Sequence, residues 1–173
     1  MTLAVSPMAP APVPLSVSLT EWHAEAGDRF VVDTEKNEGY LVHADGRYAA
    51  IPVVTGRRKF ICYIGRCYNG ATPTGTWKVK SRDIKGDHIT FGSSGRFLRL
   101  YKDGEESTAY GIHEYGYEEK MFSGDDRFKS MGCIIVKKAV MDILDATYTL
   151  NGEDIDVITQ ENIVEPVSAA FPK

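Results

Sequence analysis

The chain has 173 residues, of which 43% are hydrophobic and 25% are charged, a composition typical of one globular domain and not of a disordered chain. Its formal net charge of −4 lacks the basic excess of a general nucleic-acid binder, so no nucleic-acid partner is expected. No stretch approaches the roughly 18 apolar residues of a membrane span. Three cysteines are too few for a disulfide scaffold, and their odd number leaves at least one thiol unpaired.

The first 18 residues are rich in proline, alanine and serine, and four of the eight prolines fall between Pro7 and Pro14. Proline fixes φ and lacks a backbone N–H, so residues 1–18 are predicted to be a flexible leader. A secretory signal carries a basic segment before an unbroken apolar one, but the first basic residue here is Arg29. The N-terminus therefore does not settle the compartment.

From residue 30 onward, the pattern predicts short strands separated by polar and glycine-rich turns. Asp45-Gly46, for example, supplies the positive φ of a tight hairpin. The expected strands are residues 30–34, 40–43, 47–54, 76–81, 88–91, 96–101, 109–113, 133–136 and 155–159.

One helix is predicted at 137–147, where apolar residues recur on one face, and a weaker helix at 19–26. Many short strands with one clear helix favour a mainly β fold, a β-sandwich of mixed sheets whose helix follows strand 133–136. We expect one domain over residues 19–165, followed by a tail at 166–173.

The segment from His113 to Cys133 combines the groups that thiol-based acyl transfer requires. That chemistry needs a thiolate, a base within hydrogen-bond reach and backbone N–H donors for the oxyanion. Cys133 is a candidate nucleophile, and His113 can take its proton if two neighbouring strands hold the side chains together. Gly132 lets the backbone approach a substrate carbonyl closely. The alternative is a buried structural cysteine, the more common fate of a lone thiol.

The local pattern resembles the signature of the L,D-transpeptidase catalytic domain, or YkuD domain: a His, a loop, then Ser/Thr-His-Gly-Cys and usually an Arg two residues later. Here sixteen residues separate His113 from Ser130, and Ser130, Gly132 and Cys133 match by position. The resemblance extends upstream to FVVDTEKNEGYLVHADGRYAAIPVVTG (30–56) and ATPTGTW (71–77), and downstream to NGEDIDVI (151–158). It covers roughly residues 29–159.

Two residues depart from this signature: Met131 replaces its second His, and Ile135 replaces its Arg. These changes put substrate-carboxylate recognition in doubt more than the chemistry, and Lys137, Lys138, Lys129 or Arg127 are possible substitutes. Glu114, where the family usually has a small residue, either orients His113 or faces solvent, and we expect it to face solvent. The catalytic assignment comprises Cys133, His113, Ser130 and Gly132, and the substrate-binding assignment comprises Tyr110, Met131 and Ile112.

The resemblance implies an L,D-transpeptidase that forms 3→3 cross-links in peptidoglycan through a Cys133 thioester of a tetrapeptide stem. The alternatives are an L,D-carboxypeptidase that uses water as acceptor, and a non-catalytic peptidoglycan-binding relic of the same fold. No cofactor or metal is implied. The expected partners are peptidoglycan stem peptides, the expected location is the cell envelope or periplasm, and the chain is expected to be a monomer.

Other cysteine acyltransferases fit less well. A sortase needs an Arg after its catalytic Cys, and papain-like and NlpC/P60-type hydrolases place the Cys before the His. Cys62 and Cys67 flank a turn in what looks like an insertion, where they either form a disulfide or stay reduced. The basic run Arg57-Arg58-Lys59 is either a solvated turn or the edge of a groove for an anionic peptide.

Overall fold

The computed structural model describes residues 13–173, so most of the expected leader, residues 1–12, lies outside the described residues. Helical elements are few: the 3-10 turn η1 (Leu19–Glu21) and helices α1 (Glu118–Phe122), α2 (Lys138–Leu150) and α3 (Pro166–Ala170). The strands are β1 (Leu15–Ser16), β2 (Arg29–Asp33), β3 (Glu38–Val42), β4 (Arg47–Pro52), β5 (Thr55–Gly56), β6 (Phe60–Tyr63), β7 (Arg66–Asn69), β8 (Gly75–Ile84), β9 (Arg96–Lys102), β10 (Glu106–His113), β11 (Phe128–Ser130), β12 (Ile134–Ile135) and β13 (Ile155–Gln160). Among these residues, no helix has the length and apolar character to cross a membrane.

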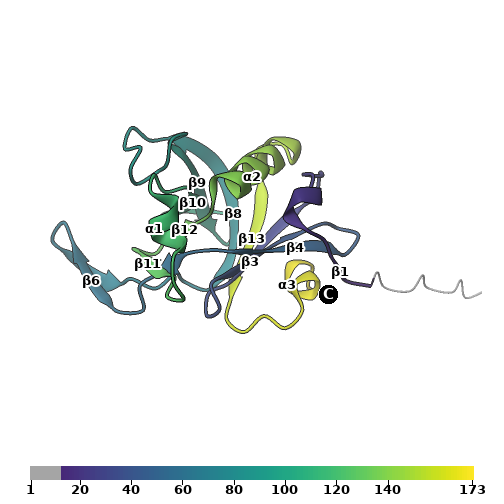
Figure 1. Ribbon diagram of the computed structural model, residues 1–173, viewed down its shortest axis with the longest axis horizontal. Helices are drawn as coiled ribbons and strands as arrows, with labels where there is room; N and C mark the ends of the chain where they lie inside the picture. The colour runs from purple at the N-terminus through teal and green to yellow at the C-terminus, as the bar shows by residue number, and fades with distance from the viewer. Residues whose placement is uncertain (1–12) are drawn as a thin grey trace, which may run out of the picture.

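A nine-stranded sheet organises the domain, in the order β1-β4-β3-β2-β13-β8-β9-β10-β12 (Figure 1). Most neighbours are antiparallel, but β1–β4, β2–β13 and β10–β12 are parallel. Two small sheets, β5–β11 and β6–β7, complete the fold. The predicted mainly β architecture of mixed sheets is therefore confirmed, as is the helix after the Cys133 strand.

Two apolar clusters explain why the central strands are almost continuously hydrophobic, because both faces of β2 and β3 are covered. Phe30, Val32 and Leu41 join the main core with residues of β8, β9, β10, β12 and α2. The alternate residues Val31 and Val42 pack on the opposite face beneath α3. Figure 1 shows α2 and α3 on opposite sides of the sheet.

The residues expected to form a tail, 166–173, instead complete that second cluster. Pro166 begins α3, and the Glu165 carboxylate accepts hydrogen bonds from the Val167 and Ser168 amides, which is a side-chain N-cap. Ala170 is fully buried, and Arg29 lies over the Phe171 ring. The prediction of a tail was therefore wrong, because these residues form a short, capped helix that packs on β2 and β3.

Two local predictions also differ from the structure. Residues 88–91 form turns, because the Asp87 carboxylate accepts hydrogen bonds from the Ile89 and Thr90 amides and bends the chain away from a strand. The weak helix at 19–26 is reduced to η1. Just before it, β1 pairs with β4, so the end of the expected leader joins the sheet.

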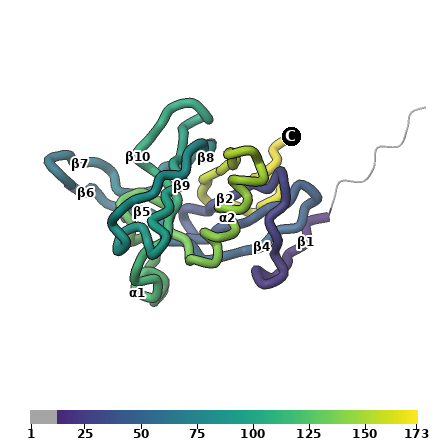
Figure 2. Tube along the Cα trace, turned by 90° about the horizontal axis from the view of Figure 1, so that it is seen from above, coloured from purple at the N-terminus to yellow at the C-terminus, as the bar shows by residue number. Residues whose placement is uncertain are grey.

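The β6–β7 hairpin projects from the end of the molecule opposite to β1, as both Figure 1 and Figure 2 show. It is a two-stranded sheet in which Cys62 and Cys67 are cross-strand partners with Cα atoms 4.0 Å apart. These two cysteines form a disulfide, and Cys133 is the free cysteine of the described residues.

Candidate active site

Strands β10 and β12 bring His113 and Cys133 to one face of the sheet edge. They run parallel, with Ile112 opposite Ile134 and His113 opposite Ile135. Extending this register by one residue places Cys133 beside Gly111, two residues before His113. Since side chains alternate along a strand, Cys133 and His113 share a face, whereas Ile112 and Ile134 point into the core.

The His113 imidazole is buried between aromatic rings and is oriented by the backbone. Its centroid lies 5.0 Å from that of Phe91 and 5.9 Å from that of Phe97. Nδ1 lies 2.6 Å from the Glu114 carbonyl oxygen, so Nδ1 carries the proton and donates it. Burial lowers the pKa of His113, although the carbonyls of Glu114 and Thr90 partly oppose the shift. The ring is therefore neutral at pH 7, which makes Nε2 the basic nitrogen.

The Cys133 thiol is also neutral in this geometry. Its Sγ donates a long contact of 3.9 Å to the Ala109 carbonyl. Burial raises the pKa of Cys133 to about 11, while the Gly111 amide and the charge of Arg99 act in the opposite direction. A neutral thiol and a neutral imidazole require proton transfer during attack, in contrast to a preformed thiolate–imidazolium pair.

The turn that precedes Cys133 is held by side chains beneath it. The Ser130 hydroxyl donates to the Cys133 carbonyl at 2.6 Å and accepts from the Gly132 amide at 3.2 Å. The Thr72 hydroxyl donates to the Gly132 carbonyl at 2.9 Å. Ser130 thus shapes the turn, and its side chain is buried away from solvent.

Gly132 is dictated by both conformation and space. Its φ of +123° is one that residues with a Cβ rarely adopt, and an added Cβ would lie 2.5 Å from the Tyr110 ring. Tyr110 therefore packs directly on the turn, and its ring meets Trp77 edge-on at 6.2 Å.

Of the three residues assigned to substrate binding, Tyr110 packs on the turn before Cys133 and Met131 belongs to that turn, whereas Ile112 lies elsewhere. Met131 is 39% exposed, and its carbonyl accepts a hydrogen bond from the Tyr68 hydroxyl of β7 at 3.1 Å. Ile112 is fully buried in the main core, so its assignment to the substrate site was wrong. The alternation that places His113 on the outer face of β10 directs its neighbour inward.

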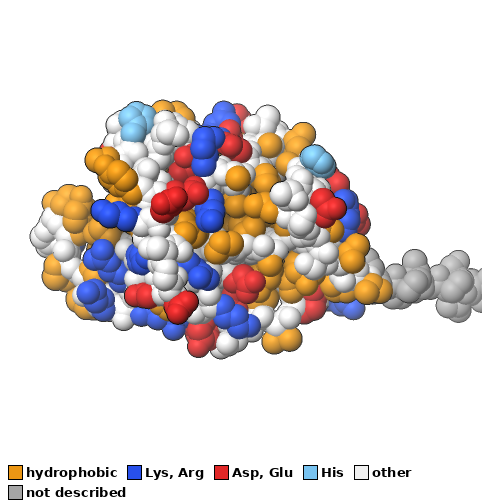
Figure 3. Space-filling view, in the orientation of Figure 1, with side chains coloured by type: hydrophobic (Ala, Val, Ile, Leu, Met, Phe, Trp, Pro, Cys, Tyr) orange, Lys and Arg blue, Asp and Glu red, His pale blue; other side chains and the backbone are white. Residues whose placement is uncertain are grey.

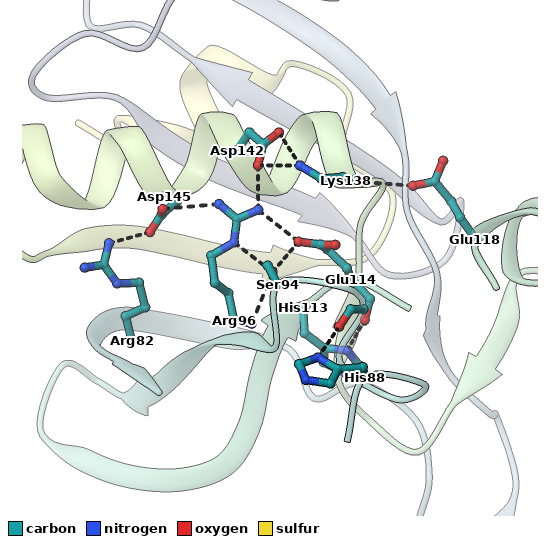
Figure 4. A network of polar contacts seen from close by, with 11 residues as sticks. Arg82, His88, Ser94, Arg96, His113, Glu114, Glu118, Lys138, Asp142 and Asp145 are labelled. Carbon is teal, nitrogen blue, oxygen red and sulfur yellow. Dashed lines mark hydrogen bonds and ion pairs between the residues drawn. The ribbon is translucent and has the colours of Figure 1, made fainter. Parts of the chain in front are cut away.

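Glu114 is buried and does not face solvent as expected (Figure 4). Its Oε1 accepts hydrogen bonds from the Ser94 hydroxyl at 2.6 Å and from the Arg96 guanidinium at 2.9 Å. Arg96 also pairs with Asp142 and Asp145 of α2. Glu114, whose carbonyl orients His113, is thus linked to α2 through Arg96.

Most of the basic residues considered as substitutes for the family Arg are engaged elsewhere. Lys129 Nζ caps the carbonyls at the end of α1, Arg127 donates to the Val53 and Asn37 carbonyls, and Lys138 pairs with Asp142. Lys137 lies over the Phe122 ring.

Arg99, absent from the sequence-based assignments, is the cation whose charge acts on Cys133. It stands opposite Gly111 on β9 and pairs with Asp83 at 2.6 Å. The alternation of RFLRLY places Arg99 and His113 on the same face of the sheet, a signal that the sequence did contain. Thr72 also carried a signal, since it lies within the quoted ATPTGTW segment, whereas nothing in the sequence pointed to Tyr68.

Away from Cys133, one group of possible metal ligands occurs within residues 13–173: Glu25, Asp28 and His43 lie within 4.8 Å of one another. The His43 Nδ1 is bonded to Asp28 at 2.6 Å, and its ring stacks on Trp22 at 3.7 Å. The hydrogen bond and the ring stacking give this group a structural role, because together they hold the segment after η1 against the sheet.

Comparisons with known proteins agree with this architecture. A family model described as the L,D-transpeptidase catalytic domain (YkuD) matches residues 27–150. A search of curated proteins finds no match.

Among solved structures, the chain is similar to an L,D-transpeptidase of Xylanimonas cellulosilytica, with a TM-score of 0.55 and 22% identity over 79% of this chain and 62% of that one. It is also similar to the helical cell shape determining protein Pgp2 of Campylobacter jejuni (TM-score 0.50, 17% identity, 79% of this chain and 49% of that one). A variant of an L,D-transpeptidase of Enterococcus faecium gives a TM-score of 0.50 at 17% identity over 79% of this chain and 50% of that one. The chain spans less than two thirds of each of these structures, and the likeness concerns the fold.

Proposed function

Because the chain belongs to the L,D-transpeptidase catalytic domain (YkuD) family, we propose that it is a peptidoglycan acyltransferase whose nucleophile is Cys133 and whose base is His113. The observation that carries the proposal is the common face of β10 and β12 that holds the free thiol and the oriented imidazole. Ser130 and Gly132 act by shaping the turn that presents the thiol.

In the first step, His113 Nε2 takes the thiol proton as Sγ attacks the carbonyl of the L-centre of diaminopimelate in a tetrapeptide stem. The tetrahedral oxyanion is stabilised by the Cys133 amide, because the Gly132 amide already donates to Ser130. The C–N bond to the terminal D-Ala then breaks, and the imidazolium returns its proton to the leaving amine. A thioester and free D-Ala result.

In the second step, the side-chain amine of another stem attacks the thioester carbonyl, which releases the thiol and forms a 3→3 cross-link. Water in the same role would make the protein an L,D-carboxypeptidase. Arg99 is the candidate cation for a substrate carboxylate, since it faces the same side as Cys133, two strands away. Peptidoglycan as substrate implies action in the cell envelope, and the reaction as written requires a single copy of the chain.

Mass spectrometry of a disaccharide-tetrapeptide incubated with the protein tests the proposal. A cross-linked dimer with loss of D-Ala supports transpeptidation, and a tripeptide alone supports carboxypeptidation. Neither product, together with no covalent adduct on Cys133 from a carbapenem, would indicate a binding relic, the alternative that Met131 and Ile135 suggest. Cys133→Ala is the matched control for both measurements.

A further inference from the structure

The β6–β7 hairpin has a charge opposite to that of the whole chain. Residues 57–70 contain four basic residues and no acidic ones, in a protein whose net charge is −4. Arg58 pairs with Glu161 at 3.7 Å, whereas the side chains of Lys59 and Arg66 form no ion pair within residues 13–173, so these two charges are unneutralised. Such a concentrated basic surface attracts anionic partners.

The hairpin also exposes large apolar side chains that a free surface does not favour. Phe60 is 72% exposed, Ile64 at the turn is 82% exposed, and Tyr63 lies between them. Figure 3 shows orange and blue side chains side by side at this end of the molecule. Exposed aromatic residues interspersed with cations are typical of surfaces that bind a partner.

The base of the hairpin is bonded to the turn that carries the nucleophile. The Arg57 amide donates to the Ser130 carbonyl at 3.0 Å, and Arg57 Nε donates to the Lys129 carbonyl at 3.1 Å. On the other strand, Tyr68 donates to the Met131 carbonyl. The base of the hairpin therefore lies next to the turn that precedes Cys133.

We propose that the β6–β7 hairpin is a docking arm for an anionic peptidoglycan strand, beyond the stem atoms that react. The guanidinium and ammonium groups of Arg66 and Lys59 pair with stem carboxylates, and the ring of Tyr63, which stands opposite Arg66 in the hairpin, stacks on sugar rings or apolar stem side chains. The Cys62–Cys67 disulfide adds a covalent link between the two paired strands. This inference rests on the proposed function, because it assigns a substrate surface next to the proposed nucleophile.

A basic and apolar hairpin tip also has the character of a membrane-binding loop. The hydrogen bonds between the hairpin base and residues 129–131 favour the polymer substrate. A polymer can contact both the hairpin and the neighbouring turn, whereas a bilayer would contact only the tip. The membrane is therefore the competing outcome of the test.

The test measures co-sedimentation with insoluble peptidoglycan sacculi at low salt for two charge-reversed variants. Lys59→Glu/Arg66→Glu alters the hairpin, and Lys80→Glu/Lys102→Glu makes the same change in net charge at exposed positions of β8 and β9. We expect at least a tenfold rise in the dissociation constant for the hairpin variant and less than a twofold rise for the control. Tyr63→Ala, which leaves the charge unchanged, should weaken binding several-fold. Amidating the sacculus carboxylates should weaken binding of the unaltered protein.

Equal effects of the two charge reversals would overturn the proposal, as would sedimentation only with vesicles of phosphatidylglycerol and phosphatidylcholine. Thermal unfolding and Cys133 alkylation show whether each variant has folded. Because binding needs no turnover, the same comparison in a Cys133→Ala background separates this inference from the proposed chemistry. Lost turnover with hairpin-dependent binding would contradict only the chemistry, and turnover with hairpin-independent binding would contradict only the docking arm.

Discussion

The turn around Cys133 and the β6–β7 hairpin touch each other but are stabilised in opposite ways. The turn is fixed from below by Ser130 and Thr72 hydroxyls, and its histidine is oriented by a carbonyl whose residue is itself ion-paired in the interior. The hairpin has one disulfide, few contacts with the body and side chains open to solvent. Buried polar bonds hold the geometry of the turn, whereas the exposed hairpin is held mainly by its own strand pairing and disulfide.

The largest expected effect is at the turn itself. Cys133→Ala should abolish formation of cross-linked product and of tripeptide, because no other free thiol occurs in the described residues. The melting temperature should change little, since a small side chain replaces another. Product formation by this variant at the unaltered rate, measured by mass spectrometry, would refute the assignment of the nucleophile.

Alkylation of Cys133 should depend steeply on pH. The thiolate is the reactive form, and burial raises the pKa of this thiol to about 11. The iodoacetamide rate should therefore rise about tenfold per pH unit from pH 7 and level off near pH 11, whereas an ordinary thiol levels off near pH 8.5. A plateau already reached at pH 7, with site-resolved labelling, would mean that the thiolate is preformed.

Replacing the base should cost less than replacing the nucleophile. His113→Gln should lower turnover by about 10²–10⁴-fold, the usual contribution of a general base. Because burial keeps the His113 imidazole neutral at pH 7, the melting temperature should be nearly the same at pH 7 and at pH 8. Turnover within twofold of the unaltered protein would place the base elsewhere.

Breaking the buried pair that supports His113 tests the origin of precision at the turn. Glu114→Ala should destabilise the protein by about 3 kcal/mol, because it leaves Arg96, whose side chain is only 13% exposed, with less compensation. Lys138→Ala, which breaks an exposed ion pair of the same network, should cost below about 1 kcal/mol. Urea unfolding measures both, and equal costs would show that the buried pair has no special weight.

The smallest global effect should come from the hairpin. Cys62→Ser/Cys67→Ser should change the free energy of unfolding by about 2 kcal/mol or less, because the closed loop is short and the hairpin can open without unfolding the sheet. Proteolysis within residues 57–70 should nevertheless become faster. Before reduction, the denatured protein should show one titratable thiol, and three would rule out the disulfide.

Much of the fold followed from periodicity, and the order of His113 and Cys133 with their loop was enough to predict that neighbouring strands bring the two residues together. The errors arose where a side chain far away in sequence decides the outcome. Glu114 is buried because Ser94 and Arg96 donate hydrogen bonds to its carboxylate. Residues 166–173 pack on the domain because β2 and β3 present a second apolar face. Ile112 was a different kind of error, because strict alternation from His113 would have placed it in the core.

The parallel pairing of β2 with β13 has a consequence for how this chain acquires its structure. Val31 aligns with Ile158, so the centre of the sheet forms only after more than a hundred intervening residues have been made. Until then, β2, β3 and β4 are an antiparallel meander whose β2 edge has unpaired N–H and C=O groups and apolar side chains on both sides.

Contacts between residues so distant in sequence slow folding, because the entropy of closing the loop is lost before the pairing stabilises it. During that interval, the exposed β2 edge is the part of the chain most open to pairing with another molecule. The yield of soluble protein should therefore be limited by the lifetime of this half-built sheet, and cooler, slower expression should raise it.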